Sequence, residues 1–303
     1  MTRALRYGLL TTGLVLAGCA VLGLVAGSAL AAAHRQLAPL TGRTLGTITA
    51  VDGSRVEVRW TPGDGPERTD AVELAGPAPP VGTRTEVAYD PAAPDHPLVP
   101  GAAPLAAADG ALGALYLAAT VAALVIAVAC WQVVSRWWVA RRPAHPVAVR
   151  RVRVQAGLLA RSYLETEATP RRWIPVHFDP ALVGLRSPAT VRVHGDPLRD
   201  RLVAVGVEGR LLPASGPVRA REPRGRRTDN PTAPDAATLA RATRLAPLRR
   251  QLRADLPLAL PAPLAALAWT YLDGGGLATW AGATALLAAA GLWLGALRGS
   301  DPS

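Results

Sequence analysis

Apolar residues in this chain are gathered into long blocks separated by polar stretches. Four blocks cover residues 8–33, 110–134, 256–272 and 277–297, and none has an Arg, Asp, Glu, His or Lys residue in its interior. A helix needs about 20 residues to cross a bilayer, so blocks of this kind are typical of membrane spans. The pattern predicts four transmembrane helices and excludes an ordinary soluble globule.

The block at residues 256–272 differs from the others because it holds Pro257, Pro261 and Pro263. Each proline removes a backbone donor, and a helix in lipid must compensate for the lost hydrogen bond. Only the sequence Asp-Gly-Gly-Gly at residues 273–276 separates this block from the next one. We therefore expect a transmembrane helical hairpin over residues 256–298.

Arginine is divided unequally between the two long connecting segments. Residues 34–109 hold 6 Arg and 10 acidic residues, whereas residues 135–255 hold 24 Arg and 10 acidic residues. Because basic residues near membrane spans are retained in the cytoplasm, residues 135–255 should lie inside the cell and residues 34–109 outside. Arg3, Arg6 and Arg298 then place both termini in the cytoplasm, in a multi-pass protein of the cell membrane.

The first helix, within residues 1–33, has two alternative interpretations. Residues 16–19, Leu-Ala-Gly-Cys, match a lipoprotein signal, in which Cys19 would be lipidated and become the mature N-terminus. Residues 29–31, Ala-Leu-Ala, match a signal-peptidase site. Apolar sequence continues beyond Cys19, which favours an uncleaved helix. All three interpretations place residues 34–109 outside.

Residues 34–109 are expected to form a small extracytoplasmic β domain. Apolar and polar residues alternate over 44–51 and 55–60, with the turn-forming pair Asp52-Gly53 between them, and a further strand is expected over 84–89. A domain this short buries little apolar surface, so we expect contact with the membrane or with a partner to stabilise it.

This part of the chain resembles a known family. The resemblance rests on Gly-Thr-Ile-Thr-Ala-Val at 46–51, Val-Glu-Val-Arg-Trp at 56–60, and a segment at 81–91 that ends in Tyr-Asp-Pro, with Pro94 following. It is similar to bacterial membrane proteins catalogued as a domain of unknown function, in which a small β domain lies between two helices and ends in Tyr-Asp-Pro-x-x-Pro. The resemblance covers about residues 8–134 and implies a membrane-anchored β module without an assigned activity. The Arg-rich segment and the last two helices go beyond the minimal unit of this family. The composition suggests that they are an addition of an actinobacterial type.

Residues 135–218 are expected to form a cytoplasmic β-rich domain, which gives the whole chain a membrane α+β fold class. Alternation of Val with Arg or Ala marks a strand at 147–155. Further strands are expected at 162–167, 172–178, 189–194, 201–207 and 210–212, punctuated by Gly and Asp-Pro steps. A compact antiparallel sheet or a small barrel should result.

Two similar motifs occur within this domain, Val-His-Phe-Asp-Pro at 176–180 and Val-His-Gly-Asp-Pro at 193–197. His177, Asp179, His194 and Asp196 are candidate metal ligands, because His and carboxylate groups two residues apart on a strand share a face. The alternative is that Asp-Pro ends each strand by turn chemistry, and we favour this alternative. No metal and no cofactor is therefore expected.

The segment that leads to the hairpin is basic. Residues 219–236 are rich in Arg, Pro and Gly, which predicts a disordered linker. Residues 237–255 predict a basic amphipathic helix, kinked at Pro247, whose arginines contact anionic lipid headgroups at the inner membrane surface. These arginines are Arg241, Arg244, Arg249, Arg250 and Arg253. Nucleic acid is the competing partner for so much Arg, but no recognition motif accompanies it, so nucleic-acid binding is not expected.

Motifs of catalysis and coupled transport are absent from the sequence. There is no Walker A loop, G-x-S-x-G or HExxH motif, and Cys19 and Cys130 both lie in apolar blocks. The spans contain none of the ionisable groups that coupled transport uses. We expect a non-enzymatic envelope scaffold or interaction protein that forms a homo-oligomer or binds an envelope protein. The alternative is an accessory subunit of a transporter or membrane enzyme complex. Helix contacts could use Gly23-x-x-x-Gly27 and Gly291-x-x-x-Gly295.

Overall fold

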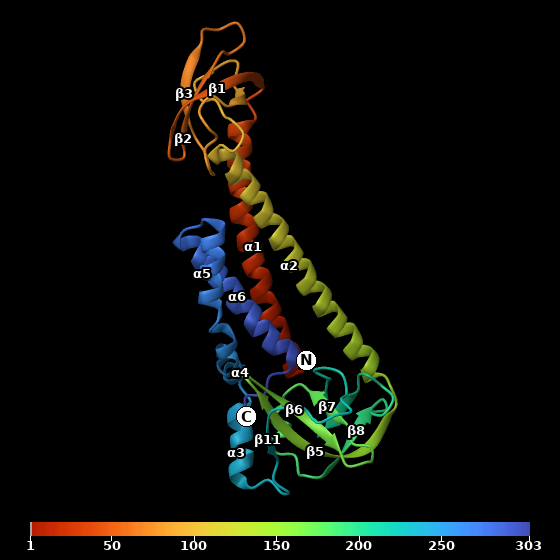
Figure 1. Cartoon of the computed structure of the whole chain (residues 1–303). Helices are drawn as coiled ribbons and strands as arrows, with labels where there is room; N and C mark the ends of the chain where they lie inside the picture. Colours follow the sequence, from red (N-terminus) through yellow and green to blue (C-terminus); the bar gives the residue numbers. More distant parts are fainter. Residues whose placement is uncertain (1) are drawn as a thin grey trace. The chain divides into compact units, whose positions relative to one another are not determined.

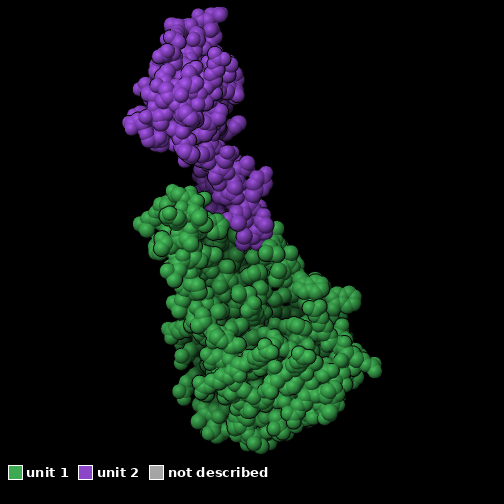
Figure 2. Space-filling model, in the orientation of Figure 1, with its two compact units in different colours: residues 1–19, 122–303 green, residues 20–121 purple. Residues whose placement is uncertain are grey.

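The computed structural model describes residues 2–303 and combines long helices with two β-sheets (Figure 1). The chain divides into two compact units, one of residues 20–121 and the other of residues 1–19 and 122–303 (Figure 2). Within the described chain, three helices are long and apolar enough to cross a membrane: α1 (Arg3–Leu37), α2 (Ala103–Ala140) and α6 (Leu277–Arg298). The expectation of an α+β chain with helices long and apolar enough to span a membrane is confirmed.

The third predicted span does not form one long helix. It consists of the 3-10 helix η2 (Leu256–Ala259) and the helix α5 (Ala262–Asp273), with the break next to Pro261. The 12 residues of α5 extend about 18 Å, whereas the apolar core of a bilayer is about 30 Å thick. Three helices rather than four therefore reach spanning length, and the fourth span remains a prediction.

The hairpin of α5 and α6 is closed by glycine contacts. A Cβ atom added at Gly291 would lie 2.6 Å from the carbonyl oxygen of Leu258, and one at Gly295 would lie 2.8 Å from Leu258 Cδ1. Only glycine permits this approach of α6 to η2. Gly23 and Gly27 have the same spacing, but a Cβ atom added at either position would have no heavy atom within 4 Å in its own unit.

The unit of residues 20–121 holds an antiparallel sheet with strand order β3-β2-β1-β4. The strands are β1 (Gly42–Asp52), β2 (Arg55–Trp60), β3 (Arg68–Glu73) and β4 (Arg84–Tyr89). Its core gathers around Trp60 and Tyr89, whose ring centroids are 5.0 Å apart. The Trp60 Nε1–H group donates to Asp70 on β3, which the sequence analysis did not predict as a strand. The three strands that the sequence predicted in this unit are present.

The Tyr-Asp-Pro ending has a structural reason in this sheet. The Tyr89 ring covers Gly42, where an added Cβ would lie 2.5 Å from the ring carbon Cζ. The Asp90 carboxylate then accepts a hydrogen bond from the Ala92 N–H group at 2.9 Å, which turns the chain away from β4. The motif therefore packs the sheet and ends its last strand.

The other unit holds an antiparallel sheet with the order β10-β9-β8-β5-β6-β7, and β11 also pairs with β5. The strands are β5 (Ala144–Ala156), β6 (Leu159–Thr166), β7 (Trp173–Val176), β8 (Ala189–His194), β9 (Ala204–Val207), β10 (Arg210–Leu212) and β11 (Arg226–Asp229). A strand is present in each of the six segments where the sequence predicted one. The expectation of a disordered linker at 219–236 was wrong for β11, because its backbone pairs with residues 152–155 of β5.

Residues 237–255 form two helices, α3 (Ala236–Leu245) and α4 (Leu248–Asp255), where one helix kinked at Pro247 was expected. Asp235 caps α3 by accepting from the Thr238 N–H group at 2.7 Å. The buried residues Ala242 and Leu245 of α3 pack with Phe178 and Val183 of the sheet domain. This apolar face of α3 therefore covers the domain rather than facing lipid.

Candidate functional site

Three long helices reach the seven-stranded sheet within the unit of residues 1–19 and 122–303, and the polar groups of interest meet there. The first turns of α1 contact the α3–α4 segment through Arg3 and Tyr7. The last turns of α2 contact the sheet domain through Arg136, and the residues after α6 contact it through Asp301. This joint is the candidate functional site.

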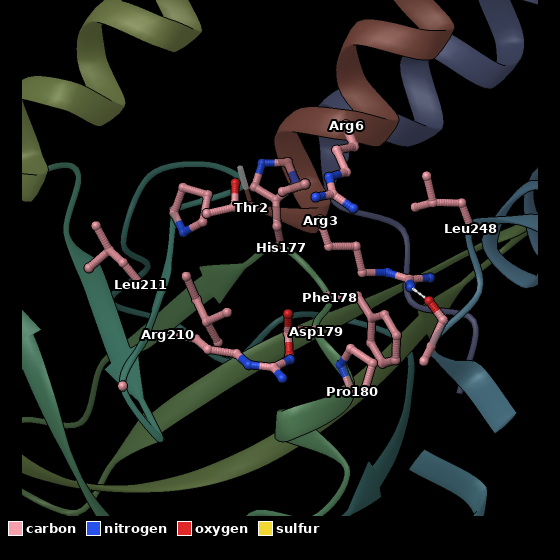
Figure 3. A pocket seen from close by; sticks show the side chains of 15 residues that line it. Thr2, Arg3, Arg6, His177, Phe178, Asp179, Pro180, Arg210, Leu211 and Leu248 are labelled. Carbon is pink, nitrogen blue, oxygen red and sulfur yellow. Dashed lines mark hydrogen bonds and ion pairs between the residues drawn. The ribbon is translucent and has the colours of Figure 1, made fainter. Parts of the chain in front are cut away.

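A cavity of about 500 Å³ lies beside the start of α1 (Figure 3). Arg3 and Arg6 of α1 line it together with Arg210 of β10, His177 and Asp179. Asp179 is its one acidic lining residue among the described residues, and its Oδ1 atom lies 3.2 Å from Arg210 Nη1. Three guanidinium groups against one carboxylate make the cavity cationic, so it is suited to hold an anion.

Arg3 has a second role in this joint, because it ties α1 to the connection between α3 and α4. Its Nη1 group donates to the carbonyl oxygen of Ala246, and its Nε group donates to Gln251 Oε1 at 3.3 Å. Its guanidinium carbon also lies 5.5 Å from the centroid of the Phe178 ring. Among the arginines that line the cavity, Arg210 pairs with Asp179, whereas neither Arg3 nor Arg6 forms an ion pair with a carboxylate of residues 2–303, so both leave positive charge in the cavity unneutralised.

His177, one of the four candidate metal ligands, lies buried at the edge of this cavity. Its Nε2 atom is 2.7 Å from Nη2 of Arg136. Burial, together with the nearby charges of Arg136 and Arg161, holds the pKa of His177 well below its usual range. The imidazole is therefore neutral at pH 7, and it accepts a hydrogen bond from Arg136.

The other three candidate ligands take part in turns and backbone contacts. Asp179 Oδ1 accepts from the Ala181 N–H group at 3.0 Å, and Asp196 Oδ1 accepts from the Leu198 N–H group at 2.8 Å. His194 Nδ1 lies 3.1 Å from the carbonyl oxygen of Arg142. Across residues 2–303, no group of three His, Cys, Asp or Glu side chains is placed to hold a metal ion. The geometry thus supports turn chemistry for both Asp-Pro steps.

A buried polar cluster that the sequence analysis missed joins α1, α4 and the residues after α6. The Asp255 carboxylate accepts from the Tyr7 hydroxyl at 2.6 Å and from the Ser300 hydroxyl at 2.8 Å. Gln251 donates to the Ser300 carbonyl oxygen at 3.2 Å. Burial raises the pKa of Asp255, although the two hydroxyl donors oppose that shift. No local pattern marks these residues, because their partners lie far away along the chain.

The segment Ser300–Ser303 is docked on the sheet. Asp301 Oδ2 lies 2.9 Å from Arg151 Nη2 and also accepts from the Ser162 hydroxyl. The Asp301 N–H group donates to the carbonyl oxygen of Ala160 at 2.9 Å, so this segment lies beside the first residues of β6, which β7 does not pair with. Burial alone would raise the pKa of Asp301, but Arg151 and the hydroxyl donors outweigh it and lower the pKa.

The five arginines predicted to contact lipid lie outside the cavity near α1. All five are exposed, on α3 and α4. None forms an ion pair within the part of the chain that the structure describes. They are Arg241, Arg244, Arg249, Arg250 and Arg253.

The joint has two properties: its cationic cavity is suited to hold an anion, and its buried contacts hold the helices against the sheet. Its donors are guanidinium groups, and its buried carboxylates are held by hydroxyl groups or by Arg151. We found no match to this chain among protein-family models, curated proteins or solved structures.

Proposed function

We propose that this chain is a multi-pass protein of the cell membrane that acts as a non-enzymatic scaffold or interaction protein. In this proposal, residues 34–109 lie outside the cell, residues 135–255 lie in the cytoplasm, and both termini are cytoplasmic. Support comes from the three long apolar helices and from the excess of Arg in residues 135–255. The likeness to envelope proteins with a small β domain between two helices is part of the same proposal.

The observation on which this proposal rests is the joint between helices and sheet. Asp301, which follows α6, forms a buried ion pair with Arg151 of β5, and Tyr7 of α1 donates to Asp255 of α4. These contacts make α6, the start of α1 and the seven-stranded sheet one packed body. A sheet fixed to membrane helices in this way presents a constant surface beside the bilayer, which is what a scaffold requires.

Surface contact with anionic lipid is a further element of the proposed function. Arg249, Arg250 and Arg253 of α4 are exposed next to the hairpin, and each basic residue near an anionic surface contributes about 1 kcal/mol to binding. For α3, whose apolar face is already covered by Phe178 and Val183, the contact would be electrostatic only.

Cysteine accessibility tests the topology. Gly76 and Arg221 are exposed positions in the two connecting segments, and Cys130 can be replaced by Ala to lower the background. A membrane-impermeant maleimide should label Gly76→Cys in intact cells and should label Arg221→Cys only after permeabilisation. Labelling of both positions from one side would overturn the proposal.

Proximity labelling in native membranes tests the scaffold role. Because Arg3 and Ser303 both take part in buried or half-buried contacts, the labelling enzyme should be inserted near Arg221 and not at either terminus. Labelling of a second, differently tagged copy of this chain, with no other protein recovered, would support a homo-oligomeric scaffold. Repeated recovery of one transporter or membrane enzyme would favour the alternative of an accessory subunit.

A further inference from the structure

A second cavity, of about 330 Å³, lies between the last turns of α2 and residues 213–217, which follow β10. Its α2 side is lined by Val128, Trp131 and Arg136, among others, and its opposite side includes Arg201 and Ser215. All of these residues belong to the unit of residues 1–19 and 122–303. The two arginines are its charged lining residues, and no carboxylate of residues 2–303 lines it.

Arg136 is a half-buried cation that has only neutral partners. Its Nη2 group donates to Gln132 Oε1 at 3.0 Å and to His177 Nε2 at 2.7 Å. Burying a guanidinium group without a counter-charge is unfavourable, and amide and imidazole groups satisfy its hydrogen bonds without neutralising it. No ion pair within the described chain involves Arg136 or Arg201. The cavity therefore has two positive charges and lacks an anion.

The lining changes from apolar to polar along α2. Val128 and Trp131 come from the apolar stretch of this long helix, and Trp131 is 68% exposed. Ser135 and Arg136 follow one turn later, and Arg201 approaches from the sheet domain. Exposed Trp residues at the end of a span are typical of the membrane interface. A ligand that fits this gradient has an apolar part on the side of Val128 and an anionic group at Arg136.

We propose that this cavity binds the headgroup phosphate of an anionic phospholipid, with Arg136 and Arg201 as its ligands and Val128 and Trp131 beside the acyl chains. The proposal rests on the proposed placement of α2 in the membrane. It differs from the surface contact of α4, because it is a defined site that holds one lipid molecule. It also differs from the cavity beside α1, where Asp179 already pairs with Arg210.

Native mass spectrometry of the full chain tests this site. The protein is released from nanodiscs that contain equal amounts of phosphatidylglycerol and phosphatidylcholine, and the retained lipids are counted. The wild type should retain one phosphatidylglycerol in preference to phosphatidylcholine. Arg136→Gln and Arg201→Gln should each reduce that retention by about fivefold or more. Arg221→Gln, which removes one exposed positive charge elsewhere, should leave retention unchanged.

Arg201→Gln is the decisive variant if Arg136→Gln does not fold, because the Arg201 side chain is exposed and forms no hydrogen bond or ion pair within residues 2–303. Equal retention of both lipids by the wild type would overturn the proposal. An unchanged preference in folded Arg201→Gln would also overturn it. Inorganic phosphate and glycerol phosphate serve as competitors without acyl chains, and displacement of the lipid by either at millimolar concentration would reassign the cavity to a free anion. The cysteine-labelling result reports the topology separately, so loss of this site leaves the proposed function standing.

Discussion

Asp301 and Arg151 form an ion pair whose side chains are 0% and 4% exposed, with Oδ2 and Nη2 2.9 Å apart. Arg151 lies on the same face of β5 as the core residue Val149, because residues two apart on a strand share a face. The doublet Arg150-Arg151 moves the apolar alternation to the opposite face, where Val152 is buried. The positive charge of Arg151 on the first face is matched by Asp301, which follows α6.

Removal of one partner of this pair should destabilise the unit. Asp301→Ala leaves Arg151 buried without a counter-charge, and loss of one partner of a buried pair costs about 3–5 kcal/mol. We expect a clear fall in the melting temperature of the detergent-solubilised protein. The double variant Asp301→Ala with Arg151→Ala should lose less than the sum of the single variants. Additive losses would contradict a direct interaction, and Glu222→Ala, in an exposed ion pair, is the control.

The same pair should make the protein sensitive to acid. Because the folded state lowers the pKa of Asp301 below 3.8, its contribution to stability is complete above that value and is lost as the pH falls through the lowered pKa. The melting temperature of the wild type should therefore fall more steeply below about pH 4 than that of Asp301→Asn. Parallel profiles for the two proteins would show that Asp301 is not held in this way.

Asp255 should show the opposite dependence. Burial raises the pKa of Asp255, so the folded protein becomes more stable as the pH falls through the raised pKa. The variant Asp255→Asn should lack this increase in stability. At pH 7, Asp255→Asn removes a buried charge and keeps an acceptor for Tyr7, so its free energy of unfolding should stay within about 1 kcal/mol of the wild type.

Asp255→Ala is the contrasting variant for this cluster. It leaves the buried hydroxyl groups of Tyr7 and Ser300 without their acceptor, which should cost about 1–3 kcal/mol for each unsatisfied group. Chemical denaturation followed by intrinsic fluorescence measures both variants. A larger loss in Asp255→Asn than in Asp255→Ala would contradict the assigned hydrogen bonds.

Gly291 should tolerate no side chain. The added Cβ of Gly291→Ala would lie 2.6 Å from the Leu258 carbonyl oxygen, so η2 and α6 must move apart, at a cost of about 1–3 kcal/mol. Gly282→Ala, in the same helix, meets no atom within 4 Å and should be neutral or slightly stabilising. Thermal unfolding in detergent compares the two variants, and equal melting temperatures would argue against the close approach.

Much of the fold could be predicted from the sequence, because long apolar blocks and alternating strands are local patterns. The exceptions are informative. β3 and β11, with the sequences Arg-Thr-Asp-Ala-Val-Glu and Arg-Arg-Thr-Asp, show little or no apolar alternation and join their sheets through backbone hydrogen bonds. The apolar composition of residues 256–272 predicted one helix, but the helix is broken next to Pro261, because a proline removes a backbone donor.

The candidate site could be predicted only in part. His177 and Asp179 were singled out by their motif, but their actual partners, Arg136 and Arg210, are 41 and 31 residues away along the chain. The clusters around Asp255 and Asp301 join residues separated by 248 and 150 positions. Contacts of this kind depend on the assembled fold, and no spacing within a short segment indicates them.

The docking of Asp301 also sets an order of events during biosynthesis. Arg151 leaves the ribosome 150 residues before its partner, which corresponds to roughly 8–30 s of translation. Throughout that interval, one face of β5 has an unneutralised guanidinium group where the finished domain is dry. The nascent domain should therefore remain incompletely closed until α6 and the residues after it have been synthesised, which makes completion of the domain wait for the last of the long apolar helices.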